Sequence, residues 1–246
     1  MRMSSAWIAA LMAVLSSSPS WAQPPCAFVD FNADTPGAPP AIGGPNQPSM
    51  LFIGPGTSIL VQPSANGIGS QPVVLSVSSQ GQFVSVAKSF PPVSLGVVRV
   101  EATLAIGHLG NGFFLQTGVD EEHAVVTRIM LLASGSIIDY FGTPLGTYAA
   151  GVPFRARMDI DMTADTWSCA IDNELDGFAD DAPTSGIPFV NPTSVIPSVG
   201  AVNCSLLLFG EGPTATTAAY DDISVVCPGV TAARPGTWGD LKLRYR

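Results

Sequence analysis

The sequence has little charge, little histidine and almost no helical periodicity beyond its first 22 residues. Asp, Glu, Lys and Arg make up 12% of the 246 residues, and only two residues are histidine. His108 and His123 lie apart and outside any motif, so we predict neither a zinc cluster nor a Ser-His-Asp or Cys-His nucleophile. The missing helical period argues against a helix bundle and favours an all-β protein.

Basic residues are also scarce. Lys and Arg total 10 against 19 Asp and Glu, and the formal net charge is −9. Phosphate backbones repel such an acidic chain, so we expect no nucleic-acid partner. The longest apolar stretch beyond residue 22, at 129–133, is far shorter than a membrane-spanning helix, so we expect no membrane span.

Residues 1–22 have the pattern of a secretory signal peptide. Arg2 supplies a positive charge, residues 6–15 form an apolar segment of signal length, and Ala22 ends a small-residue cleavage site. The alternative is an N-terminal membrane anchor, for which the apolar segment is short. We expect a secreted or periplasmic protein with a sandwich domain over 23–228 and a basic tail over 229–246.

Four cysteines in an exported chain predict two disulfides, for which three connectivities exist. Cys26 and Cys227 lie in the first and last apolar strands of the domain, and a fold that pairs those strands would join them. Cys169 and Cys204 each share a strand face with large apolar residues, so both are expected in the core and are predicted as the second pair. The alternative is that some of these cysteines are buried thiols, because cysteine packs well as a small apolar residue.

Short apolar runs separated by 25 glycines and 22 prolines are typical of a sandwich or barrel. Two runs, 97–106 and 154–163, alternate strictly between apolar and polar residues, which indicates one buried and one solvated face. Segment 35–72 is predicted as loops with one or two short strands. The other predicted strands are 73–78, 82–87, 113–118, 124–133, 136–141, 166–172, 201–209 and 219–226.

Three segments resemble a family of secreted domains. Residues 28–37 (FVDFNADTPG) resemble the opening strand and loop, 154–173 (FRARMDIDMTADTWSCAIDN) the central hairpin, and 219–225 (AYDDISV) the closing strand. The chain is therefore similar to concanavalin A-like or LamG-like lectin and glucanase domains, and to carbohydrate-binding modules. The resemblance implies an all-β, two-sheet antiparallel jelly-roll sandwich.

The resemblance also implies a structural Ca²⁺ held by the first loop and the last strand. The matching residues are Asp30 or Asp34, together with Asp221 or Asp222. Adjacent residues of a strand point to opposite faces, so at most one of the last two is a ligand, and we predict Asp30, Asp34 and Asp222.

A second acidic segment, 172–181, places acidic residues at its first, third and fifth positions and a glycine at its sixth, as in an EF-hand loop. Its twelfth position is Pro183 and not Glu. The alternative is a hairpin that turns at 172–173 and begins its return strand at Glu174, and the surrounding alternation favours the hairpin.

Catalytic residues are incomplete. Laminarinase-type enzymes of this fold carry Glu-x-Asp-x-x-Glu, and here Glu174 and Asp176 are followed by Ala179, so the general acid is missing. Asp159 and Asp161 follow Arg155 and Arg157 on one face, which indicates an ion ladder.

We therefore predict a non-catalytic secreted module that binds a glycan or a cell-surface component. The alternatives are a structural or adhesive surface protein and a diverged glycoside hydrolase or polysaccharide lyase. Jelly-roll lectins bind sugars with aromatic and planar polar side chains on a concave sheet or at loop tips. The candidates of these types in this chain are Tyr140, Tyr148, Gln116, Asn111 and Arg128.

Overall fold

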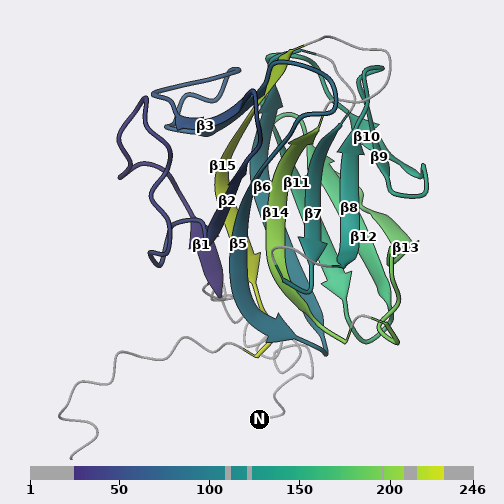
Figure 1. Ribbon diagram of the computed structural model, residues 1–246. Coiled ribbons are helices and arrows are strands. Elements are labelled where there is room, and N and C mark those ends of the chain that lie inside the picture. The colour runs from purple at the N-terminus through teal and green to yellow at the C-terminus, as the bar shows by residue number, and fades with distance from the viewer. Residues whose placement is uncertain (1–24, 109–111, 121–123, 196, 208–214, 230–246) are drawn as a thin grey trace, which may run out of the picture. The chain divides into compact units, whose positions relative to one another are not determined.

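The computed structural model describes residues 25–108, 112–120, 124–195, 197–207 and 215–229. Within these residues the chain forms two antiparallel sheets that lie one behind the other (Figure 1). The predicted all-β jelly-roll sandwich is confirmed. The same residues contain no helix, and hence no helix that is long and apolar enough to cross a membrane.

Sheet A has the strand order β13-β12-β11-β6-β15-β4-β3, and β1 pairs with β15 beside this path. Its strands are β1 (Ala27–Val29), β3 (Thr57–Val61), β4 (Val73–Val77), β6 (Val97–Ile106), β11 (Phe154–Asp161), β12 (Thr166–Asp172), β13 (Thr184–Pro188) and β15 (Thr216–Val226).

Sheet B has the strand order β10-β9-β8-β7-β14-β5-β2. Its strands are β2 (Met50–Ile53), β5 (Phe83–Val93), β7 (Phe113–Gly118), β8 (Val125–Leu131), β9 (Ser136–Asp139), β10 (Pro144–Thr147) and β14 (Val199–Leu207). Strands far apart in the sequence are neighbours here, since β14 lies between β7 and β5. Of the strands in both sheets, β10 was not predicted, because it is short and carries no clear alternation. β2 and β3 lie in segment 35–72, for which one or two short strands were predicted without bounds.

Alternating apolar residues explain why the strands form and which face each one buries. On β11 the side chains of Phe154, Ala156, Met158 and Ile160 are almost fully buried, while the residues between them are partly exposed. Tyr220 of β15 stacks on Phe113 of β7 in the space between the sheets, with ring centroids 4.7 Å apart. Burying a large side chain of this kind contributes about 1.5–3 kcal/mol, so the two-sheet core is the main source of stability.

The first and last strands of the sandwich lie side by side, as expected. β1 pairs with β15, the Cys26 amide donates to the Val225 carbonyl at 2.7 Å, and Cys26 forms a disulfide with Cys227. The predicted disulfide that closes the domain is thus confirmed.

The predicted Cys169–Cys204 disulfide is wrong, because both residues are buried thiols. Cys204 lies on β14, which packs against β4 and β15, whereas Cys169 lies on β12, three strands from β15 in sheet A. Three strand spacings amount to about 14 Å. A disulfide requires Cα atoms within about 7 Å of each other. Burial raises the pKa of both thiols, so both remain protonated and unreactive.

The hairpin predicted to return at Glu174 is also corrected. β12 does pair with β13, but the return strand begins at Thr184, after a long loop. Leu175, Gly177 and Phe178 have positive φ angles, and these fold the chain around the carboxylate of Asp172 instead of continuing as a strand.

Candidate functional site

A row of polar side chains crosses the outer face of sheet B. Strand register places Arg128 of β8 opposite Gln116 of β7, and Gln116 opposite Asn203 of β14. Arg128 Nε donates a hydrogen bond to Gln116 Oε1 at 2.9 Å. Neighbouring core residues such as Leu115 and Cys204 point to the other face, so alternation directs this row outward.

Asn203 lies at the centre of this face and is almost fully buried, with 4% of its surface exposed. Its Oδ1 atom has no hydrogen-bond partner among the described residues. A buried polar atom without a partner costs roughly 1–3 kcal/mol, so this acceptor suits a donor that comes from outside the protein.

A hollow of about 330 Å³ lies beside the row. Its walls combine aromatic, thioether, hydroxyl and amide groups, namely Met50, Phe52, Phe83, Ser85, Gln116, Asn203 and Ser205. Phe52 is 49% exposed, and its ring lies 5.2 Å from that of Phe83. Ser85 and Ser205 hydrogen-bond to each other through their hydroxyls at 2.9 Å. The hollow thus offers an apolar ring surface next to fixed polar groups.

Arg128 is held on this face by two aromatic rings. The Cζ atom of its guanidinium lies 5.1 Å from the ring centroid of Phe114 and 5.5 Å from that of Tyr140. Burial lowers the pKa of Arg128, and the Coulombic interaction with Tyr140 opposes this effect. An arginine keeps its charge after such a shift, so the row ends in a partly buried cation.

Three of the predicted ligand-binding residues therefore lie together, namely Gln116, Arg128 and Tyr140. Tyr148 does not join them: it packs in the core, and its hydroxyl donates to the Leu132 carbonyl at 2.6 Å. Asn111 falls outside the described residues, as do His123, the predicted signal peptide and residues 230–246 of the predicted tail.

Sequence reasoning missed Asn203, Phe52 and Phe83. The only signal for Asn203 was a polar residue between apolar ones in the 201–209 strand, a pattern shared by ordinary surface positions. Phe52 lies in a segment that was predicted mainly as loop. Its approach to Asn203 depends on β5 lying between β2 and β14.

The outer face of sheet A carries the predicted ion ladder. Arg99 and Asp159 form an ion pair at 2.6 Å, Arg157 lies 3.7 Å from the same carboxylate, and Arg155 pairs with Glu101 at 3.2 Å. These partners explain Asp159 as part of a salt-bridge network and confirm the expected ladder for Arg155, Arg157 and Asp159. The fourth predicted member, Asp161, accepts hydrogen bonds from the backbone amides of Thr163 and Ala164.

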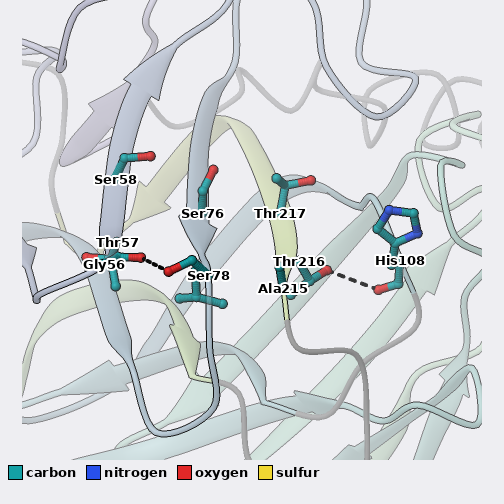
Figure 2. A pocket seen from close by; sticks show the side chains of 10 residues that line it. Gly56, Thr57, Ser58, Ser76, Ser78, His108, Ala215, Thr216 and Thr217 are labelled. Carbon is teal, nitrogen blue, oxygen red and sulfur yellow. Dashed lines mark hydrogen bonds between the residues drawn. The ribbon is translucent and has the colours of Figure 1, made fainter.

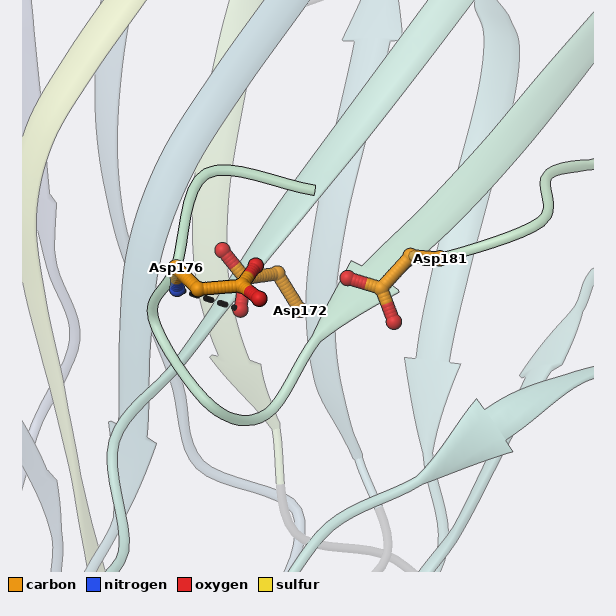
Figure 3. Close-up of side chains that lie close together, drawn as sticks. All are labelled: Asp172, Asp176 and Asp181. Carbon is orange, nitrogen blue, oxygen red and sulfur yellow. Dashed lines mark hydrogen bonds between the residues drawn. The ribbon is translucent and has the colours of Figure 1, made fainter. Parts of the chain in front are cut away.

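A group of three carboxylates lies in the loop after β12. Oxygens of Asp172, Asp176 and Asp181 lie within 4.8 Å of one another, and Figure 3 shows Asp181 facing the other two from the returning segment. Partial burial and the neighbouring carboxylates, first among them Asp172, raise the pKa of Asp181. Its Oδ2 atom is buried and without a partner among the described residues. This cluster could hold a metal ion.

Asp172 also organises the loop. Its carboxylate accepts backbone hydrogen bonds from Asp176, Gly177 and Phe178 at 2.9–3.2 Å. Burial raises the pKa of Asp172, but these hydrogen bonds together outweigh burial and lower it overall. The ring of Phe178 lies under the guanidinium of Arg157, 4.6 Å from its Cζ, which ties the loop to β11.

The residues predicted to hold calcium near the termini form no comparable group in the described part of the chain. Asp30 Oδ1 accepts from the Asn32 amide, and Asp34 Oδ1 accepts from the Ala41 amide. Asp222 is exposed, while Asp221 is buried and accepts a hydrogen bond from the Ser70 hydroxyl. The strand geometry assumed for the two aspartates is corrected, because the register of β15 with β6 shifts between Asp221 and Ser224 and Asp222 has a positive φ angle. The residues on either side, Tyr220 and Ile223, both face the core, so the two aspartates do not simply alternate. The calcium site at this position stays a prediction.

A second hollow, of about 450 Å³, lies near the ends of β3, β4 and β15 (Figure 2). Its walls carry several hydroxyls, including those of Ser58, Ser76 and Thr217, and the imidazole of His108. Ser78 and Thr216 donate to the carbonyls of Gly56 and His108. The side chains that line it include no aromatic ring except the imidazole and no carboxylate, so it lacks the combined ring surface and amides of the sheet B hollow.

Comparisons with known proteins define the fold. No family model and no curated protein matches the chain. A solved sialidase structure superimposes with a TM-score of 0.56 at 10% identity over 73% of this chain, which spans 17% of the sialidase chain. A cellulose-induced protein gives a TM-score of 0.51 at 13% identity, covering 81% of this chain and 96% of its own. The Emp47p carbohydrate recognition domain gives 0.47 at 12% identity, covering 82% and 95%.

At such low identities, the likeness concerns the fold alone. The predicted resemblance to the concanavalin A-like lectin and glucanase fold is confirmed.

Proposed function

We propose that this protein is a non-catalytic carbohydrate-binding sandwich that holds a glycan against the outer face of sheet B. The observation that carries the proposal is the buried Asn203 Oδ1, which has no partner in the described part of the chain and lies in the wall of a hollow that exposed Phe52 also lines. The names of two similar folds, a sialidase and a cellulose-induced protein, both refer to carbohydrate and support the ligand class.

The chemistry of the face suits a sugar. A pyranose presents many hydroxyl donors around its rim and an apolar face of C–H groups. One hydroxyl would donate to Asn203 Oδ1, and the ring would stack on Phe52. Pockets that bind small molecules typically combine apolar walls with a few convergent polar groups in this way.

A binding role is favoured over hydrolysis because the residues that line the hollow include no carboxylate. Glycosidases need a pair of carboxyl groups that flank the scissile bond. The described acidic clusters and ion pairs lie on sheet A and its loops.

We also propose that the protein acts outside the cytoplasm, as a secreted or periplasmic protein. The Cys26–Cys227 disulfide supports this location, since disulfides persist in oxidising compartments. The signal-peptide pattern of residues 1–22 supports the same compartment.

A glycan array followed by affinity gel electrophoresis would test the ligand class, with Asn203→Leu as the central variant. Leu has a similar volume and no polar atom, so we expect its unfolding free energy to be unchanged or higher than that of the wild type. Binding should nevertheless weaken about tenfold, which corresponds to the loss of one good hydrogen bond. Phe52→Ala should weaken binding as well, through lost stacking.

Ser76→Ala is the matched control, because Ser76 lines the hollow on the other sheet. It should bind the same glycan as the wild type does. The proposal is wrong if no glycan on the array is retained at millimolar concentration, or if Asn203→Leu binds unchanged.

The metal that we propose for Asp172, Asp176 and Asp181 is Ca²⁺, which prefers several carboxylate oxygens. Calcium should raise the unfolding temperature of the wild type above that of a chelator-treated sample. This difference between calcium and chelator should be smaller in Asp176→Asn. Equal melting temperatures with calcium and with chelator would rule out a structural ion in this loop.

A further inference from the structure

The outer face of sheet B carries a single charge among its described strand residues. The strands of this sheet contain three charged residues, Lys88, Arg128 and Asp139. The Lys88 ammonium donates to three backbone carbonyls of the 44–47 segment. Asp139 is 1% exposed, and its Oδ1 accepts from the amides of Phe141 and Thr143. Among the described strand residues of sheet B, Arg128 alone presents its charge on the outer face.

Arg128 has no carboxylate partner in the described part of the chain. Its only hydrogen bond there joins Nε to Gln116, and its other contacts are the rings of Phe114 and Tyr140. The arginines of sheet A differ, because Arg99, Arg155 and Arg157 each lie beside an aspartate or glutamate. A partly buried cation without a counter-ion is costly, and an anionic ligand would remove that cost.

The geometry favours a planar anion. Two rings hold the guanidinium, and Gln116 occupies Nε, so the terminal nitrogens remain for a ligand. A guanidinium binds a carboxylate through two parallel N–H···O bonds, and this pairing is stronger than a neutral hydrogen bond.

We infer that the sheet B site selects glycans whose sugars carry carboxylate groups, with Arg128 as the residue that recognises the carboxylate. This inference rests on the proposed glycan binding and deepens it. Asn203 and Phe52 would hold the sugar through contacts that any glycan can make. Arg128 lies two strands away from Asn203, about 10 Å across the sheet. It would therefore bind the carboxylate of a sugar next to the one that Asn203 and Phe52 hold, in an extended glycan chain.

The span of the face agrees with an extended ligand. Exposed aromatic residues mark both ends, with Phe52 on β2 and Tyr140 directly after β9. Five strand spacings separate β2 from β9, which is about 24 Å. A polymer could therefore contact Phe52, Asn203 and Arg128 at once.

The test compares carboxylated polysaccharides with their own carboxyl-reduced forms by affinity gel electrophoresis. The probes are polygalacturonate, alginate and hyaluronate, each before and after reduction of the carboxylates to primary alcohols. We expect the wild type to bind at least one carboxylated probe roughly tenfold more tightly than its reduced form, as one charge-assisted pair would give. The preference should shrink as salt is raised.

Arg128→Gln should lose this preference and bind both forms alike. Arg99→Gln is the matched control, because it removes a partly exposed arginine from the outer face of sheet A. It should retain the full preference. Unfolding midpoints of both variants establish that they are folded, and the wild-type comparison needs no variant at all.

Equal wild-type binding to carboxylated and reduced forms would overturn the inference and leave glycan binding intact. Stronger, Arg128-dependent binding to dextran sulfate than to any carboxylated probe would also overturn it, since the selected group would then be a sulfate. Binding to none of the probes and to no neutral glycan would instead defeat the proposed function itself.

Discussion

Removing the Cys26–Cys227 disulfide should destabilise the sandwich strongly. The bond joins residues 201 positions apart, so it encloses nearly the whole domain. In the chain-entropy model a loop of this length lowers the entropy of the unfolded chain enough to contribute about 5 kcal/mol at 25 °C. The native strands should persist without it, because β1 remains paired with β15 along Ala27–Val29. The loss therefore acts mainly on the unfolded state.

The measurement is urea unfolding of the wild type and of a Cys26→Ser/Cys227→Ser variant, with and without reductant. We expect the variant to lose about 3–5 kcal/mol of unfolding free energy. In thermal unfolding of a domain of this size, the same loss should lower the midpoint temperature by about 6–20 °C. Reductant should destabilise the wild type to the same extent and leave the variant unchanged.

The two buried thiols supply an internal control. The denatured, unreduced wild type should expose two reactive thiols, those of Cys169 and Cys204, and reduction should raise the count to four. The reasoning fails if the variant loses less than about 1 kcal/mol, because loop entropy would then not act as described. It also fails if reductant still destabilises the variant, since a second disulfide would then exist.

Three further changes test individual interactions. Tyr220→Phe removes a buried hydroxyl that donates to the carbonyls of Phe114 and Ser205, so denaturant unfolding should show a loss of about 1–2 kcal/mol, and no loss would contradict those bonds. Thr127→Val leaves the buried hydroxyl of Thr117 without its 2.8 Å partner and should cost about 1–3 kcal/mol, whereas the Thr117→Val/Thr127→Val double variant should be nearly neutral in the same assay. Asp172 has a lowered pKa, so its contribution to stability is present above its ordinary pKa of 3.8 and is lost as the pH falls through the folded-state pKa. The stability difference between wild type and Asp172→Asn should therefore shrink under acid, and a difference constant from neutral to acid pH would refute this account.

Local patterns predicted the strands well. The 97–106, 113–118 and 166–172 strands have the bounds that alternation indicated. The ion ladder could also be predicted from the sequence, because Arg155, Arg157 and Asp159 are spaced two residues apart on one strand and therefore share a face. Such features depend on residues close in the sequence, and backbone geometry then determines which way each side chain points.

The errors have a common physical cause. Cys169 and Cys204 do both point into the core, as alternation indicated, but their lateral distance depends on which strands are neighbours. Tyr148 was predicted as an exposed aromatic residue that binds ligand. It follows a four-residue strand, which is too short for its alternation to indicate whether the side chain faces the core or the solvent. The loop after Asp172 depends on positive φ angles at Leu175 and Phe178, which non-glycine residues rarely adopt.

By itself, the sequence determined the fold class, the faces of the long strands and the clasp between Cys26 and Cys227, because each of these follows from local alternation or from the ends of the chain. Only the tertiary structure decided the site. Gln116 and Arg128 pair across the consecutive strands β7 and β8, but Asn203 joins them because β14 inserts between β7 and β5, and the exposed ring of Phe52 approaches through β5. Long-range strand order sets those distances, and that order depends on how the whole core packs.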